Sequence, residues 1–296
     1  MANLKEIRVR ITSVVSTRQI TGAMKMVAAA KLKKAQDAIV NFRPYAGKMR
    51  EILVNVAEAA GNADNNVYAE TREHRQVLIV LITSNRGLCG AFNSNAIKEA
   101  VRLAETKYCD LFPKGKVRFA AIGKKGYDNL IKRNLHVDES FSEIFDNLTY
   151  ENTANIAQKL MDAFTEGRYD SIDVVYNRFV NAASQKVTVQ HFLPLSPEKS
   201  DAGAGKKRKH TDYIYEPSQE YIIRELIPQN LKLVVYQALL DSVASEHGAR
   251  MTSMHQATDN ASQMIQDLTL QYNKARQATI TNELVEIVSG AEALKG

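Results

Sequence analysis

The sequence has 296 residues, of which 45% are hydrophobic and 24% charged, and such a chain can bury a sizeable core. Its net charge of +6 is too small to indicate nucleic-acid binding by itself. Two cysteines exclude a disulfide scaffold and a four-cysteine zinc site. No stretch approaches the roughly 20 apolar residues of a membrane span, and no secretory signal opens the sequence. We therefore expect a soluble, intracellular, helix-rich protein.

The N-terminal segment predicts a long helix, because its first 43 residues contain no proline and one glycine, Gly22. Leu4, Ile7, Ile11 and Val14 follow the 3-4 spacing of a coiled-coil seam. The same register next meets the polar residues Arg18, Thr21 and Lys25. We therefore expect the apolar stripe to shift and to continue through Ile20, Met24, Val27 and Leu32.

The C-terminal segment predicts a second long helix, from about residue 221 to residue 289. No proline follows Pro228, and apolar residues recur at helical spacing along the segment. At 1.5 Å per residue this helix would be roughly 100 Å long, too long for a compact domain. Residues 1–50 carry a net charge of +9, whereas residues 229–296 carry −2. We therefore predict that the two chain ends form an antiparallel two-helix coiled coil.

The middle of the sequence alternates between strand and helix patterns. Apolar runs predict strands at 76–84, 116–123, 171–180 and 185–195, and amphipathic runs predict helices at 98–105, 126–133 and 155–164. This alternation indicates an α/β domain with a partly parallel sheet, whose last two strands form a hairpin. We expect four regions: a coiled-coil helix over 1–65, the α/β domain over 75–195, an exposed loop over 196–218 and a second coiled-coil helix over 219–296.

The turn after the first predicted strand is the strongest candidate for a nucleotide site. Gly87 and Gly90 follow that strand in the stretch ITSNRGLCGAFN. Their G-x-x-G spacing differs from the dinucleotide fingerprint G-x-G-x-x-G, no clear acidic residue follows at the required distance, and no P-loop motif occurs. A tight structural turn is the favoured interpretation, and a dehydrogenase-like fold is the alternative. The GKKG run at 123–126 is a still weaker candidate.

Other candidate chemistry is sparse. His247, His255 and Asp259 lie near one helical face, but the two histidines are too far apart along the helix to share a metal ion. Cys89 has no identifiable base, so a buried structural role is favoured. The KKRK run at 206–209 fits a solvated loop. The basic N-terminal helix could neutralise nucleic-acid phosphates or face an acidic protein surface, and its lack of aromatic residues disfavours recognition of single strands.

Several motifs together resemble the gamma-subunit family of the F-type ATP synthases. ITNELVEIVSGAEA at 280–293 is similar to the family's C-terminal signature, including Ile280, Thr281, Glu283, Glu286, Gly290 and Ala291. The N-terminal segment 7–32, the glycine turn 84–93, and the stretches DYIYEP, SEHGARM and YNKARQATIT also resemble the family in the same order. The loop over 198–210 departs from the family by being longer and more basic.

The resemblance implies a central-stalk rotor that is not itself catalytic and needs no cofactor. The coiled coil would lie within a ring of alpha and beta subunits, and a Rossmann-like α/β domain would lie at the foot, with epsilon and the membrane c-ring. Nucleic acid would not be a partner. The protein would be peripheral to the cytoplasmic side of a bacterial inner membrane, attached through the complex alone, and would couple ion flow to conformational change in beta.

The resemblance also implies roles for particular residues. Contacts with the beta subunit are expected at Met24, Lys25, Arg250, Arg276, Gln277, Thr281 and Glu283. Contacts with the c-ring and epsilon are expected at Tyr213, Tyr215 and Glu216. No metal-binding or catalytic residue is expected.

Overall fold

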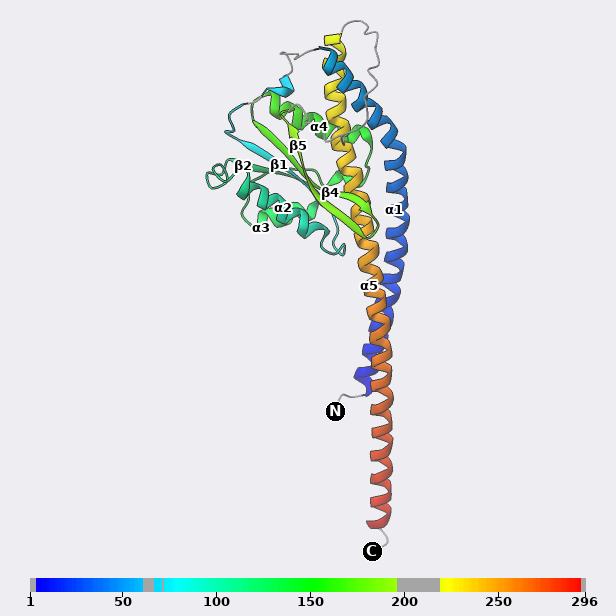
Figure 1. Cartoon of the computed structure of the whole chain (residues 1–296). Coiled ribbons are helices and arrows are strands. Elements are labelled where there is room, and N and C mark those ends of the chain that lie inside the picture. The colour runs from blue at the N-terminus through cyan, green and yellow to red at the C-terminus, as the bar shows by residue number, and fades with distance from the viewer. Residues whose placement is uncertain (1–3, 61–66, 71, 196–218, 294–296) are drawn as a thin grey trace. The chain divides into compact units, whose positions relative to one another are not determined.

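The computed structural model describes residues 4–60, 67–70, 72–195 and 219–293 (Figure 1). The chain divides into two compact units. One, here called the helix-pair unit, comprises residues 1–29 and 250–296; the other, the α/β unit, comprises residues 30–249. Two long helices belong to both units, α1 (Leu4–Ala60) and α5 (Gln219–Ala293).

The α/β unit is built on a five-stranded sheet with the order β3-β2-β1-β4-β5. Strands β1 (Val77–Ile82), β2 (Val117–Ile122), β3 (Val137–Ser140) and β4 (Ser171–Asn181) are parallel neighbours. Strand β5 (Ser184–Leu193) pairs with β4 as the predicted antiparallel hairpin. The sheet confirms the predicted α/β class. Strand β3 was not among the predicted strands.

Helices cover both faces of this sheet, which explains why β1 reads VLIVLI without a polar residue. Helices α2 (Phe92–Thr106) and α3 (Lys124–Lys132) lie on one face, and α4 (Tyr150–Thr165) and α5 lie on the other (Figure 1). Alternate residues of β1 therefore enter two cores: Ile79 and Leu81 on the α2 face, and Leu78, Val80 and Ile82 on the α4 face. Two short 3-10 turns, η1 (Val67–Ala69) and η2 (Glu143–Phe145), complete the unit.

Helix α5 is part of the core of the α/β unit. Its residues Ile227, Leu231, Val235, Ala238 and Leu239 are buried with α4 and the sheet. Further along, Ser245 donates a hydrogen bond to the main-chain oxygen of Asn177 at 3.0 Å, and Gly248 lies against the hairpin at Ala182. This stretch of α5 is therefore fixed to the sheet at several points.

The helix-pair unit is held together by the seam of a coiled coil, as the chain ends predicted. On α1, Ile7, Thr21 and Ala28 are buried and Ile11, Val14 and Lys25 are half-buried, so that the initial 3-4 register continues. The predicted shift of the stripe is wrong, because Ile20 and Val27 are exposed. Two short side chains and the flexible stem of a lysine occupy the seam there, which lets the helices approach closely.

On α5, the buried residues of the same unit are Met254, Ala261 and Leu268, seven residues apart. Both helices continue through a proline, at Pro44 in α1 and Pro228 in α5. Among the described residues, no helix combines the length and the apolarity that a bilayer crossing requires.

Candidate functional site

Polar contacts link α1 and α5 within the helix-pair unit. The Nζ of Lys25 lies 3.3 Å from the Nδ1 of His255, which in turn lies 3.3 Å from the Oδ2 of Asp259. One turn away, the hydroxyl of Thr258 donates to that of Thr21 at 2.9 Å. The Nδ1 of His255 thus lies between Lys25 on α1 and Asp259 on its own helix, and it accepts from Lys25 in one tautomer or donates to Asp259 in the other. Among the described residues there is no cluster of three or more metal-ligating side chains.

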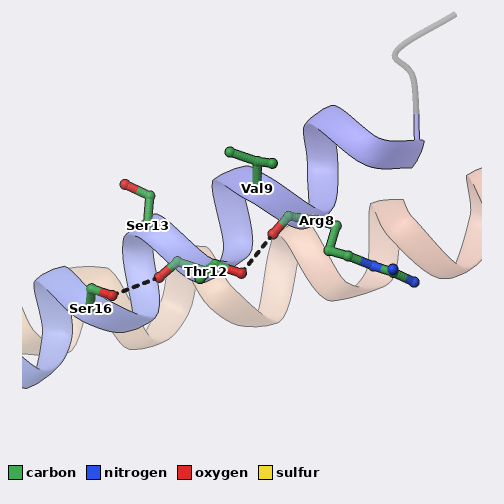
Figure 2. Close-up of a pocket in the computed structure, with 5 residues that line it drawn as sticks. All are labelled: Arg8, Val9, Thr12, Ser13 and Ser16. Carbon is green, nitrogen blue, oxygen red and sulfur yellow. Dashed lines mark hydrogen bonds between the residues drawn. The ribbon is translucent and has the colours of Figure 1, made fainter.

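Near the start of α1, a shallow hollow is lined by Arg8, Val9, Thr12, Ser13 and Ser16 (Figure 2). The Nη2 of Arg8 donates to the hydroxyl of Tyr272 at 2.9 Å, and its guanidinium lies 5.8 Å from the centre of that ring. The hydroxyls of Thr12 and Ser16 donate to main-chain oxygens one turn earlier, at 3.1 Å each. Those two hydroxyls therefore serve the helix itself, and Arg8 serves the helix pair.

The outward face of α1 exposes large apolar side chains. Val9, Ile20, Met26 and Val27 are each more than half exposed, and Met26 reaches 70%. The same segment is rich in lysine and arginine. Single exposed apolar residues are common on protein surfaces, but their recurrence along one basic helix indicates a surface that a partner covers.

The end of α5 is exposed throughout. Every residue from 276 to 293 is exposed, including Ile280 at 48%, Leu284 at 57%, Ile287 at 67% and Val288 at 61%. Their spacing of three and four residues places these four on one helical face. None of the described residues therefore covers this apolar stripe.

The structure separates the residues that the family resemblance had singled out into three groups. Met24, Lys25 and Arg250 are half-buried in the helix-pair unit, where Arg250 opens the α5 portion. The second group lies on the exposed end of α5 and comprises Arg276, Gln277, Thr281 and Glu283. Tyr213, Tyr215 and Glu216 lie outside the described residues, as does the basic run at 206–209. Contacts of all these residues with partners remain predictions.

The glycine turn after β1 is filled by side chains. The main-chain N–H of Ser84 donates to the Oδ1 of Asn93 at 3.0 Å, and the Nδ2 of Asn93 donates to the buried sulfur of Cys89 at 3.3 Å. Gly90 and the exposed Leu88 have positive φ, of 58° and 63°. These contacts close the loop against α2 and support the structural interpretation of the turn. Cys89 is buried, as expected.

The GKKG run brings α3 against the end of β1. The Thr83 hydroxyl accepts a hydrogen bond from the N–H of Gly126 at 2.8 Å and donates to the carbonyl oxygen of Gly123 at 3.3 Å. A Cβ on Gly123 would lie 2.2 Å from the Thr83 carbonyl oxygen, and the φ of Gly123 is +112°. Only glycine fits this position. The two glycines therefore have a packing role.

A buried polar cluster, which no sequence pattern indicated, lies on the α2 face. Asp173, with a fully buried side chain, accepts hydrogen bonds from Lys107 Nζ and from the Tyr108 hydroxyl, each at 2.7 Å, and its Oδ1 lies 2.7 Å from the Nδ1 of His191. Burial raises the pKa of Asp173, but the hydrogen bonds from His191, Lys107 and Tyr108 outweigh burial and hold the pKa below its ordinary value. This cluster fastens β5 and the end of α2 to β4.

A second buried carboxylate lies on α5. Burial raises the pKa of Asp241 to about 6, although the positive charges of Arg178 on β4 and Arg43 on α1 oppose the change. The carboxylate also raises the pKa of the neighbouring Tyr176, after burial. Both carboxylates lie within the α/β unit, and Asp173 links three of its elements through hydrogen bonds.

The chain is similar over its whole length to known proteins. Residues 3–294 match the profile of the ATP synthase family. The ATP synthase gamma chains of Flavobacterium psychrophilum and Flavobacterium johnsoniae are each 55% identical over 296 residues, with 100% of both chains covered. Among solved structures, a central stalk/c-ring chain of the Tetrahymena thermophila mitochondrial ATP synthase has a TM-score of 0.56 at 28% identity, covering 80% of this chain and 99% of that one.

A rotor chain of the Euglena gracilis mitochondrial ATP synthase has a TM-score of 0.65 at 22% identity, covering 94% of this chain and 98% of that one, and shows the same fold. The predicted combination of an α/β domain with paired terminal helices is thus found in solved structures as well. With matches of this extent, the chain belongs to the ATP synthase gamma chain family.

Proposed function

We propose that this chain is the central-stalk rotor of an F-type ATP synthase and couples ion flow through a membrane c-ring to conformational change in catalytic beta subunits. The observation that carries the proposal is the uncovered end of α5. Ile280, Leu284, Ile287 and Val288 form an apolar stripe on a helix that the rest of the described chain leaves in water. An enclosing ring of alpha and beta subunits would bury that stripe.

The charge and packing of the helix pair suit a part that turns inside a sleeve. Its seam uses small or flexible side chains such as Thr21, Lys25 and Ala28, which keeps the pair slim. Long basic side chains on α1 can exchange partners among acidic groups, because exposed ion pairs are individually weak. The surface of the helix pair can therefore bind the surrounding subunits at many rotation angles, without being held at one of them.

We further propose that the chain catalyses no reaction and contributes by its asymmetry. Each angle of the helix pair would favour a different conformation of the surrounding beta subunits, so that rotation changes their nucleotide affinities in turn. Epsilon and the c-ring would bind the foot, through the segment containing Tyr213, Tyr215 and Glu216. Attachment to the membrane, on the cytoplasmic side, would pass through these partners.

The proposal is tested by co-expressing the tagged chain with its own alpha and beta subunits. We expect a 3:3:1 complex of alpha, beta and this chain that hydrolyses ATP. Ile287→Lys places a charge in the apolar stripe and should lower hydrolysis or assembly. Ile131→Lys on α3, where the side chain is 46% exposed, is the matched control and should change neither. Purification of the tagged chain without alpha and beta would refute the proposed function.

A further inference from the structure

Four aromatic residues join three helices of the α/β unit, and we call them the aromatic joint: Phe42 and Tyr45 on α1, Tyr150 on α4 and Tyr236 on α5. The ring of Tyr236 lies between two others, with centroids 5.1 Å from Phe42 and 5.7 Å from Tyr150. Both contacts are edge-to-face, at interplanar angles of 83° and 89°. Phe42 also contacts Tyr45, at 6.5 Å.

The joint lies beside a break in the hydrogen bonding of α1. Pro44, between Phe42 and Tyr45, has no N–H, so the helix lacks its usual hydrogen bond to the carbonyl oxygen of Val40. A helix bends most readily at such a point. The ring contacts therefore support α1 at the position where its own hydrogen bonding is interrupted.

The joint also connects elements that are anchored differently. Helix α5 is fixed to the sheet through the core that includes Leu231, Val235 and Leu239. Tyr236 lies on the same stretch of α5 and contacts α1 on one side and the first residue of α4 on the other. A displacement of α4 relative to α1 therefore disturbs at least one of the two ring contacts of Tyr236.

We propose that the aromatic joint transmits torque within the α/β unit, from the sheet-anchored stretch of α5 to the α1 segment that contains Phe42, with Phe42, Tyr150 and Tyr236 as its positioning residues. This inference rests on the proposed rotor function. Edge-to-face rings have a preferred geometry, so displacing one ring against the other costs free energy beyond the loss of buried area. The joint thus adds torsional stiffness at the site where Pro44 removes some.

The stiffness can be measured in the assembled alpha, beta and gamma complex. Cys109 is exposed and Cys89 is buried, so a bead can be attached to the α/β unit through Cys109 in a complex whose other exposed cysteines have been replaced. With alpha and beta fixed to a surface and no ATP present, the variance of the bead angle reports torsional stiffness. We expect Tyr236→Leu and Phe42→Leu to increase this variance roughly twofold or more, because Phe42→Leu removes one edge-to-face contact and Tyr236→Leu removes two.

Two control variants separate stiffness from general damage. Tyr236→Phe keeps the ring and should retain the wild-type variance. Tyr127→Leu, which removes an aromatic ring from α3 outside the joint, should retain it as well. If Tyr236→Leu does not assemble, Tyr150→Leu replaces it, because that ring is already 39% exposed. A wild-type variance of the bead angle in the assembled leucine variants would refute the proposed role of the aromatic joint in torque transmission. A wild-type chain that forms no complex with alpha and beta would instead refute the rotor function.

Discussion

Replacing Gly123 with alanine should disrupt the α/β unit, and its cost follows from two separate features. The φ of +112° is unfavourable for any residue with a Cβ, which costs about 1–3 kcal/mol. The new Cβ would also lie 2.2 Å from the carbonyl oxygen of Thr83, a main-chain atom that cannot turn aside. Overpacking of this kind adds about 1–3 kcal/mol. The sum of about 2–6 kcal/mol is comparable with the whole stability of many domains.

The neighbouring glycines provide graded controls. At Gly126, a Cβ would lie 2.7 Å from the Thr83 hydroxyl oxygen, and a better helix propensity worth about 1 kcal/mol partly offsets that clash. At Gly87, a Cβ would meet no atom within 4 Å, so alanine should change stability by about 0.5 kcal/mol or less. In urea unfolding of the full chain, followed by circular dichroism, Gly123→Ala should have a lower midpoint than Gly126→Ala and Gly87→Ala. Equal midpoints for Gly123→Ala and Gly87→Ala would refute the packing role.

Three further predictions concern charged groups. Because the folded-state pKa of Asp241 is raised from 3.8 to about 6, the wild type should lose stability as the pH rises through that interval. Asp241→Asn should therefore be more stable than the wild type at pH ~7.5, by at most about 3 kcal/mol, and should show no gain in urea midpoint below pH ~4. Asp173 has a lowered pKa, so its contribution to folding stability is present above about pH 4 and is lost as the pH falls through its folded-state pKa. Asp173→Asn should cost about 3–5 kcal/mol of stability near neutral pH, and an unchanged thermal midpoint would contradict the stabilising role of the Asp173 cluster. Arg276→Ala combined with Gln277→Leu should lower ATP hydrolysis or assembly of the complex, because a charged hydrogen bond contributes roughly 1.5–3 kcal/mol, and should barely shift melting of the free chain. Wild-type turnover in a fully assembled double variant would remove these residues from the beta contact.

Most of the sheet could be predicted because its strands are covered on both faces. β1 and β2 are continuous apolar runs, and such runs stand out in a sequence. β3 could not be predicted from its four residues, VDES, because a short edge strand with alternating exposure has almost no apolar signal. The Asp173 cluster was equally hidden, since its members come from the end of α2, from β4 and from β5, with no characteristic spacing.

The register of the coiled coil shows a different limit. Apolar spacing alone favoured Ile20 and Val27 for the seam, but both are exposed and the seam runs through Thr21 and Ala28. Small side chains occupy the seam there because they let the two helices approach each other closely. The larger residues face outward, on a surface that other subunits would cover. Partner contacts of residues such as Arg276 and Glu283 depend on chains that the sequence does not contain, so they stay predictions.

The uncovered end of α5 has a consequence for how the cell manages this protein. A helical segment without tertiary cover opens locally far more often than a packed one. Of the segments that the structure describes, 276–293 should therefore be the one most open to proteases in newly made, unassembled chains. Insertion into the complex would close that access. We expect copies made in excess of their partners to be degraded from this end, which would keep the supply of rotors matched to the number of rings that can hold them.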